Sequence, residues 1–324
     1  MERRKVVLVL VIFVVSVLLP ASTLGAEETG RNPRKESEGF GSNMMNIAHR
    51  GARSIAPENT LIAARKAYDA GADAWEFDVQ LTGDDQVVVM HDDTLERTTN
   101  VQNLFPDRVS YEVREFTLKE IKRLDAGSWF VEEDPFGEIG KGNVPEAALE
   151  SYRGERVPTL KEALQLTKDL EWKANIEVKS IEAPAIFVDR YMVIILSRVS
   201  ELVEELEMER DVLISSFDHM AIRILEEINP ELPRAILANE PLADPVGHMK
   251  KNGVRTLNLI ASALETEKGV SNLESIDKAI PGYRVFVWTI NELAEMQRAL
   301  EVPYITGIMT DYPGRLREAI AGRG

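Results

Sequence analysis

The sequence predicts an α/β fold, a (β/α)8 TIM barrel with an insertion after its second strand and that strand's hairpin partner. From about residue 46 to residue 320, short apolar runs alternate with amphipathic helical patterns, which is typical of a parallel sheet. One of the nine runs follows its predecessor too closely for a parallel crossover. The runs are 46–49, 74–79, 87–91, 173–179, 211–217, 234–238, 256–260, 284–289 and 305–310.

The third run identifies the hairpin. Only seven residues join Val79 to Val87, whereas a parallel crossover needs about a dozen or more. We therefore expect 87–91 to double back through the turn at 82–85, which has suitable Gly and Asp residues. Eight strands then remain to close a barrel, and in that fold active sites collect at the carboxyl ends of the strands.

Helical patterns lie between the predicted strands. Asn59 is a candidate N-cap for the first of them, and the patterns cover 59–70, 159–169, 183–206, 219–229, 292–300 and 313–320. The interval of about 94–157 is too long for a plain loop. It contains a short helix that begins after Thr117 and a Gly-containing loop at 137–142. We expect it to be an insertion beside the barrel mouth, within the same domain.

Composition restricts the possible functions. The chain has 324 residues, of which 44% are hydrophobic and 28% charged, an ordinary globular composition. Its formal charge of -16 argues against nucleic acid as a partner, because phosphate backbones are bound by clustered Lys and Arg. The absence of cysteine excludes disulfides and thiolate chemistry.

The first 25 residues are typical of a signal peptide. A basic start, Met1 to Lys5, precedes an apolar run from Val6 to Leu19 and small residues suited to cleavage after Gly25 or Ala26. The run is shorter than the 20 or so residues of a membrane span, although an uncleaved anchor is the alternative. We expect export to the periplasm or the exterior, with no stable membrane anchor after cleavage. Residues 26–45 should form a flexible lead-in to a barrel at 46–320.

Three carboxylates are predicted to converge at the mouth. Strand alternation places Glu76 and Asp78 on one face, about 7 Å apart, and Glu177 and Lys179 repeat this arrangement. At about 5 Å and a dielectric constant near 20, each unneutralised carboxylate pair would repel by roughly 3 kcal/mol. One divalent cation removes the repulsion, and oxygen ligands favour Ca²⁺ or Mg²⁺ over zinc. The alternative is ordinary salt bridges, Glu177 with Lys179 and Glu76 with Arg50.

Two of the four histidines lie at strand ends near these carboxylates. His49 follows the first predicted strand and His91 ends the hairpin strand. Two histidines can serve at neutral pH as an acid and as a base or nucleophile. His219, at a helix start, and His248, on a polar helix, are interpreted as structural.

Several ordered motifs resemble the glycerophosphodiester phosphodiesterase family, a PLC-like phosphodiesterase barrel. Five occur within about fifty residues, and further matches extend to the end of the chain. They are His49-Arg50-Gly51, Ala56-Pro57-Glu58-Asn59-Thr60, Glu76-x-Asp78, His91-Asp92, Leu95-x-Arg97-Thr98-Thr99, Glu177-Val178-Lys179, Ser215-Ser216-Phe217, Trp288-Thr289-x-Asn291 and Thr310-Asp311-Tyr312-Pro313.

The resemblance implies metal-dependent hydrolysis of a small glycerophosphodiester to glycerol 3-phosphate and an alcohol. It implies that His49 and His91 bracket the scissile phosphate, with their individual roles left open. Arg50 and Lys179 would supply positive charge for the phosphodiester. Trp288 has two interpretations, a barrel-core aromatic or a wall for the glycerol moiety.

Two alternatives remain at this stage. A lysophospholipase D or a sphingomyelinase-D-like enzyme would use the same barrel but would need an apolar groove for an acyl chain. An inactive ligand-binding barrel would not need the two histidines. The alcohol group, the metal in use and the oligomeric state are not predicted.

Overall fold

The computed structural model describes residues 44–181 and 184–323. The predicted signal peptide, and the lead-in up to residue 43, lie outside the described residues. Among the described residues, no helix is both long enough and apolar enough to cross a membrane.

Eight parallel strands close into a barrel, as the sequence predicts. Each strand pairs in parallel with its neighbour, and β1 closes the ring by pairing with both β2 and β9. β3 (Val87–Val89) instead runs antiparallel to β2, with Val79 opposite Val89, which confirms the predicted hairpin. The barrel strands are β1 (Met45–His49), β2 (Ala74–Leu81), β4 (Ala174–Val178), β5 (Val212–Ser216), β6 (Arg234–Ala238), β7 (Thr256–Ile260), β8 (Arg284–Trp288) and β9 (Gly307–Thr310).

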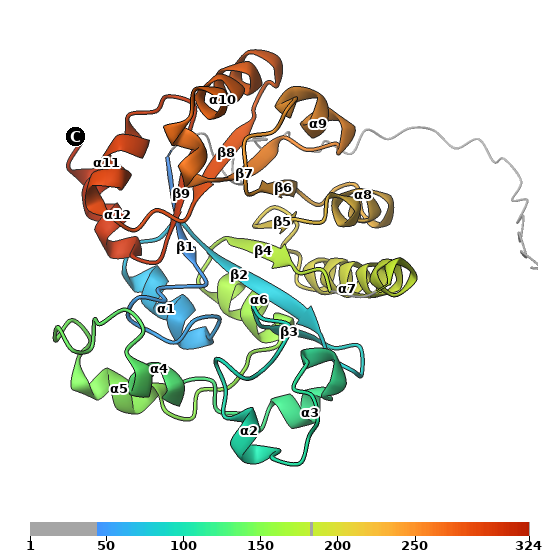
Figure 1. Ribbon diagram of the computed structural model, residues 1–324, viewed down its shortest axis with the longest axis vertical. Coiled ribbons are helices and arrows are strands. Elements are labelled where there is room, and N and C mark those ends of the chain that lie inside the picture. The colour runs from blue at the N-terminus through green and yellow to red at the C-terminus, as the bar shows by residue number, and fades with distance from the viewer. Residues whose placement is uncertain (1–43, 182–183, 324) are drawn as a thin grey trace, which may run out of the picture. The chain divides into compact units, whose positions relative to one another are not determined.

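Helices surround the strands of the barrel (Figure 1). α10 was not among the predicted helical patterns, and α9 was expected only as the polar helix that carries His248. The helices that connect the strands are α1 (Leu61–Asp69), α6 (Leu160–Asp169), α7 (Ala185–Glu205), α8 (His219–Ile228), α9 (Pro245–Lys251), α10 (Glu267–Ala279), α11 (Leu293–Leu300) and α12 (Pro313–Ala321); the short 3-10 helix η2 (Ala261–Glu265) precedes α10.

The predicted N-cap of α1 is wrong by one residue. Thr60 caps the helix, because its side chain accepts a hydrogen bond from the backbone N–H of Ala63. Asn59 instead has a positive φ of 58° and uses its side chain elsewhere: Nδ2 donates to Asp78 Oδ2 at 2.9 Å. Asn tolerates this backbone region better than most residues, so the residue joins the helix start to the barrel mouth.

The insertion between β3 and α6 consists of short helices with their own small cores. Its helices are α2 (Val101–Leu104), η1 (Val113–Glu115), α3 (Leu118–Ile121), α4 (Ser128–Glu133) and α5 (Glu146–Tyr152). Thr117 caps α3 as predicted. In one of these small cores, Phe130 and Tyr152 of the insertion pack with Ala63 of α1. The Tyr152 hydroxyl also donates to the backbone oxygen of Ile55 at 2.8 Å. The insertion thus packs against the segment that follows β1.

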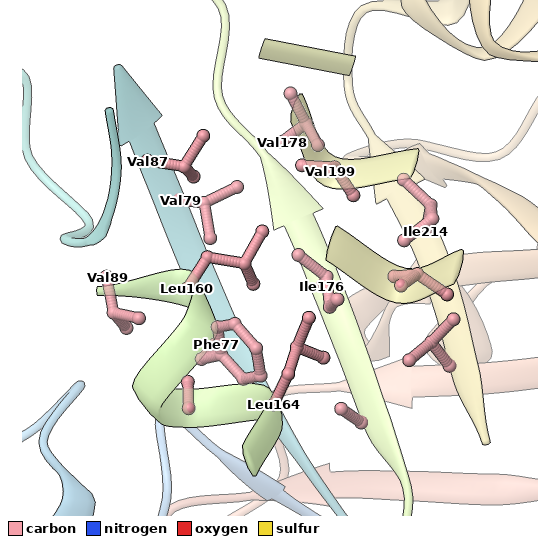
Figure 2. Packing of buried hydrophobic residues seen from close by; sticks show 14 of the residues in the cluster. Phe77, Val79, Val87, Val89, Leu160, Leu164, Ile176, Val178, Val199 and Ile214 are labelled. Carbon is pink, nitrogen blue, oxygen red and sulfur yellow. The ribbon is translucent and has the colours of Figure 1, made fainter. Parts of the chain in front are cut away.

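Because side chains alternate along the strands, the core has one part outside the barrel and one part inside it, and the site residues lie on the inner face. Phe77 and Val79 face outward and pack among residues of α6 and α7, as Figure 2 shows for Leu160, Leu164 and Val199. Inside the barrel lies a separate apolar cluster: Met45, Ile47, Ala74, Leu213, Ala235, Phe286 and Met309. Glu76 and Asp78 alternate with the outward residues of β2, so they lie on its inner face at the carboxyl end.

Candidate active site

Three carboxylates meet at the carboxyl end of β2 and β4. Glu76, Asp78 and Glu177 are all buried, and one carboxylate oxygen from each lies within 4.8 Å of the other two. The register explains the meeting, because Asp78 lies directly opposite Glu177. We call this group the carboxylate triad.

Burial and mutual repulsion disturb the ionisation of the triad. Burial, followed by the charges of Asp78 and Glu177, raises the pKa of Glu76 well above its usual range. Burial and the charge of Asp78 likewise raise the pKa of Glu177. Burial would also raise the pKa of Asp78, but the charges of Lys179 and Arg50 outweigh it and lower that pKa.

Two cations partly neutralise the triad. Lys179 Nζ lies 2.9 Å from Asp78 Oδ1 and also contacts Glu177 Oε1. Arg50 places Nε 3.4 Å from Asp78 Oδ2, and its backbone N–H donates to Glu76 Oε2 at 3.0 Å. The predicted alternative of simple strand salt bridges therefore holds only for Glu177 with Lys179, because the Arg50 side chain does not pair with Glu76.

The donor set of the triad fits a hard divalent cation. With all three carboxylates ionised, the charges of Arg50 and Lys179 leave one excess negative charge in a buried site, and this state is costly without a further positive charge. The converging atoms are all oxygens, which suit Ca²⁺ or Mg²⁺.

His49 is fixed by a buried aspartate that follows β9. Its Nδ1 lies 2.7 Å from Asp311 Oδ1. Asn291 Nδ2 donates to the other oxygen of Asp311 at 2.7 Å, and Asn291 Oδ1 accepts from the Asp311 backbone N–H at 2.9 Å. Since a carboxylate can only accept here, His49 carries its proton on Nδ1 and leaves Nε2 free. Burial lowers the pKa of His49, although the hydrogen bond to Asp311 opposes the effect.

His91 has a similar but more exposed arrangement. Its Nδ1 lies 2.6 Å from Asp92 Oδ1, and Arg97 Nε donates to Asp92 Oδ2 at 2.6 Å. The His91 side chain is 30% exposed, against 15% for His49. Both histidines thus present Nε2, one from a buried position and one from a position near solvent.

One buried glutamate joins these groups. Glu58 receives Arg50 Nη1 at 3.0 Å, Arg53 Nη2 at 2.9 Å and Arg97 Nη2 at 2.8 Å. Burial would raise its pKa, but the hydrogen bond from Arg97 and the charges of the three arginines lower the pKa of Glu58 to about 2. Arg97 also contacts Asp92, the partner of His91, and Arg50 also contacts Asp78 of the triad. Through these two arginines, Glu58 links the His91–Asp92 pair to the triad.

Trp288 forms an apolar part of the mouth. It lies at the end of β8, partly buried against the inner cluster of the barrel, and Phe217 contacts it edge to face with ring centroids 5.5 Å apart. Its indole Nε1 is buried and has no hydrogen-bond partner among the described residues. The surface that Trp288 offers to a ligand is therefore carbon.

The sequence did not assign several residues of this site. Asp311, Asn291 and Asp92 lie in motifs quoted above, and the rule that placed His49 at a strand end would also have placed Asp311 after β9. Ser216, in a motif quoted above, lies at the end of β5 and donates to the backbone oxygen of Val178 at 2.8 Å, and Asp218 caps α8.

The two remaining histidines contact each other. His248 Nε2 lies 2.7 Å from His219 Nδ1, and His219 Nε2 lies 2.8 Å from the backbone oxygen of Leu237. Neither contact includes a residue of the triad.

Comparison with known proteins gives one consistent result. The model of the glycerophosphoryl diester phosphodiesterase family matches residues 49–315. A glycerophosphodiester phosphodiesterase of Caldanaerobacter subterraneus is 32% identical over 83% of this chain and 95% of its own. A second, from Bacillus altitudinis, is 32% identical over 83% of this chain and 95% of its own.

Solved structures of phosphodiesterases are also similar to this chain. A phosphodiesterase from Oleispira antarctica, determined in complex with the product sn-glycerol-3-phosphate, is 26% identical and superposes with a TM-score of 0.69 over 85% of this chain and 96% of its own. A putative glycerophosphoryl diester phosphodiesterase from Silicibacter pomeroyi is 25% identical, with a TM-score of 0.72 over 87% of this chain and 95% of its own.

Proposed function

The chain belongs to the glycerophosphoryl diester phosphodiesterase family, and from this premise we propose that two histidines and one divalent cation carry out its hydrolysis of glycerophosphodiesters. The products are glycerol 3-phosphate and an alcohol. One observation carries the proposal: a buried carboxylate triad lies at the barrel end that also holds two histidines, each oriented by an aspartate.

The cation belongs at the triad of Glu76, Asp78 and Glu177. Ca²⁺ or Mg²⁺ bound there would supply Lewis-acid stabilisation to oxygens of the substrate. Lys179 and Arg50 now contact the triad. Both can turn their positive charge toward a phosphodiester, whose negative oxygens accept hydrogen bonds from such donors.

We assign His49 as the base and His91 as the acid. Asp311 holds the proton of His49 on Nδ1, so Nε2 can accept a proton, and the burial of this side chain favours its neutral form. His91 is nearer solvent, and because its Nδ1 contacts Asp92, its Nε2 is the atom that faces the leaving alcohol as proton donor. A departing alcohol can then leave from the more open side of the site.

The attacking group in this mechanism is the 2-hydroxyl of the substrate's own glycerol. His49 removes the hydroxyl proton, the oxygen bonds to phosphorus, and the bond from phosphorus to the alcohol breaks as His91 protonates that alcohol. Such an internal attack has an effective molarity of about 10⁵ M or more. Water then opens the cyclic phosphate, with the two histidines in reversed roles, and gives glycerol 3-phosphate.

A related protein supports the product. The phosphodiesterase from Oleispira antarctica was determined with sn-glycerol-3-phosphate, named there as the product. That protein has the same fold, so its bound product supports our proposal that this chain also releases glycerol 3-phosphate. We further propose, from the basic, apolar and small residues at the start of the chain, that the protein acts outside the cytoplasm. N-terminal sequencing of the mature protein tests this.

The function is tested by an assay over a panel of glycerophosphodiesters. Glycerol 3-phosphate release is measured for the wild type and for His49→Ala and His91→Ala. We expect each variant to lose activity by about 100-fold or more, since general acid–base catalysis contributes this much. His248→Ala, whose partner is His219, is the matched control and should retain activity. A wild type that binds these diesters without turnover would instead indicate a ligand-binding barrel.

A further inference from the structure

Gln80 is the third polar residue on the inner face of β2. It alternates with the outward residues as Glu76 and Asp78 do, so it lies one step beyond them toward the mouth of the barrel. The residue is only 2% exposed. A buried amide is costly unless its polar atoms find partners, and Gln80 finds some of them on the segment of residues 91–93, which we call the His91 loop.

Gln80 holds the His91 loop at two points. Its Nε2 donates to the backbone oxygen of His91 at 3.3 Å and to Asp93 Oδ1 at 3.1 Å. These two residues lie on either side of Asp92, whose carboxylate contacts His91 Nδ1. The amide therefore fixes the chain on both sides of the aspartate that orients His91.

Tyr191 of α7 sets the orientation of this amide. β4 ends before it reaches the level of Leu81, the last residue of β2, and the Leu81 backbone N–H donates to the Tyr191 hydroxyl at 3.0 Å. The same hydroxyl donates to Gln80 Oε1 at 3.0 Å. Burial raises the pKa of Tyr191 above its usual range, so the hydroxyl keeps the proton that it donates. With Oε1 facing Tyr191, Nε2 is the atom that faces the His91 loop.

The His91 loop depends on these hydrogen bonds because a cavity lies beside it. The Met90 backbone N–H still donates to the backbone oxygen of Asp78 at 3.0 Å, just after the end of β3. Beyond that point, Asp93 borders a cavity of about 270 Å³, which Gln80 and Tyr191 also line. Side chains that border a cavity lack close-packed neighbours on that side, so hydrogen bonds hold the loop there.

We infer that Gln80 and Tyr191 are positioning residues for His91. The inference rests on the proposed function, in which His91 protonates the departing alcohol, and it adds two residues that act through the His91 loop. A general acid must lie within hydrogen-bond reach of the atom that it protonates, and a misplacement of about 1 Å can lower a rate by about 100-fold. Without the two side chains, His91 Nε2 loses its alignment with the leaving oxygen.

The test uses two substrates that differ in their need for an acid. Choline leaves glycerophosphocholine as an alcohol that must take up a proton, whereas the p-nitrophenyl ester of glycerol phosphate releases p-nitrophenolate, an anion that needs none. Release of each leaving group is measured in the first turnover, with Ca²⁺ or Mg²⁺ present, so that the later hydrolysis of the cyclic phosphate does not enter. We call the choline rate divided by the p-nitrophenolate rate the leaving-group ratio.

Two variants remove the positioning hydrogen bonds with little change of shape. Tyr191→Phe keeps the buried ring and loses the hydroxyl, and Gln80→Met keeps the length of the side chain and loses the amide. Each should lower the leaving-group ratio by about tenfold or more, with a p-nitrophenolate rate near that of the wild type. His91→Ala removes the acid itself and should lower the ratio by about 100-fold or more.

Tyr152→Phe is the matched control. Tyr152 is also a buried tyrosine, and its hydroxyl donates to the backbone oxygen of Ile55 instead. This variant should keep the wild-type leaving-group ratio. General damage to the fold lowers both rates together, so only a misplaced acid lowers the ratio.

The outcomes separate this inference from the proposed function. If His91→Ala lowers the leaving-group ratio but folded Tyr191→Phe and folded Gln80→Met keep the wild-type ratio, the positioning role is refuted and His91 remains the acid. If His91→Ala also keeps the ratio, His91 is not the acid, and its proposed role and this inference both fail. If the wild type cleaves neither substrate, the proposed function itself fails, and the inference fails with it.

Discussion

Replacing Glu76 with glutamine should stabilise the metal-free protein. The triad oxygens lie within 4.8 Å of one another, and at about that distance and an effective dielectric constant of about 20 each uncompensated carboxylate pair repels by about 3 kcal/mol. Glu76 faces Asp78 and Glu177, and only part of this repulsion is offset by Arg50 and Lys179. The amide keeps an oxygen that can accept the Arg50 backbone N–H. We therefore expect the free energy of unfolding of metal-free Glu76→Gln to rise by about 1–3 kcal/mol.

The same substitution should remove the response to metal. A cation that binds only the folded protein adds about 2.7 kcal/mol at a free concentration of 100 times its Kd. The wild type should gain this stability in Ca²⁺ or Mg²⁺, whereas Glu76→Gln should gain little because it lacks one ligand. The assay is urea unfolding of protein freed of metal by chelation, repeated with metal added, with Glu150→Gln, an exposed residue of α5, as the matched control.

Two results would refute this reasoning. A metal-free Glu76→Gln less stable than the wild type by more than about 1 kcal/mol would show that Glu76 makes a favourable structural interaction, because substitutions away from such features usually change stability by less. An unchanged metal response in Glu76→Gln would show that the cation is not held by Glu76.

Three further predictions concern the supporting residues and the attacking group. Asp311→Asn should lower kcat by about 100-fold or more. Because Asp311 raises the pKa of His49, the same substitution should also move the acidic limb of the pH profile to lower pH. An unmoved limb would argue against His49 as the base. Glu58, whose pKa falls from 4.5 to about 2 on folding, should contribute about 3 kcal/mol of stability above pH 4.5; the deficit of Glu58→Gln in urea unfolding should therefore shrink as the pH falls from 4.5 toward 2, and a constant deficit would exclude this linkage. A substrate analogue that lacks only the 2-hydroxyl should bind yet turn over orders of magnitude more slowly, and cleavage at the parent rate would mean that water or a histidine attacks phosphorus.

The barrel was predictable because its determinants are local. Strand alternation alone placed Glu76 and Asp78 on the inner face, and the short connection from Val79 to Val87 identified the hairpin. The parallel register then brought Glu177 opposite Asp78, as expected from strands whose carboxyl ends meet at one edge.

The parts that sequence reasoning missed depend on contacts between distant segments. Asn59 has the chemistry of an N-cap, and only its contact with Asp78 shows why the cap moved to Thr60. Asp311 is separated from His49 by 262 residues, and their hydrogen bond follows from the closure of β9 against β1. The three arginines on Glu58 are likewise brought together by loops, whose conformations leave no periodic pattern in the sequence.

The central claim is that hydrolysis depends on a cation held by the carboxylate triad. The most direct measurement is the release of glycerol 3-phosphate by protein freed of metal with a chelator, followed as Ca²⁺ or Mg²⁺ is returned. We predict no turnover in excess chelator and recovery that saturates at one bound ion per chain. Full turnover in excess chelator would contradict the claim.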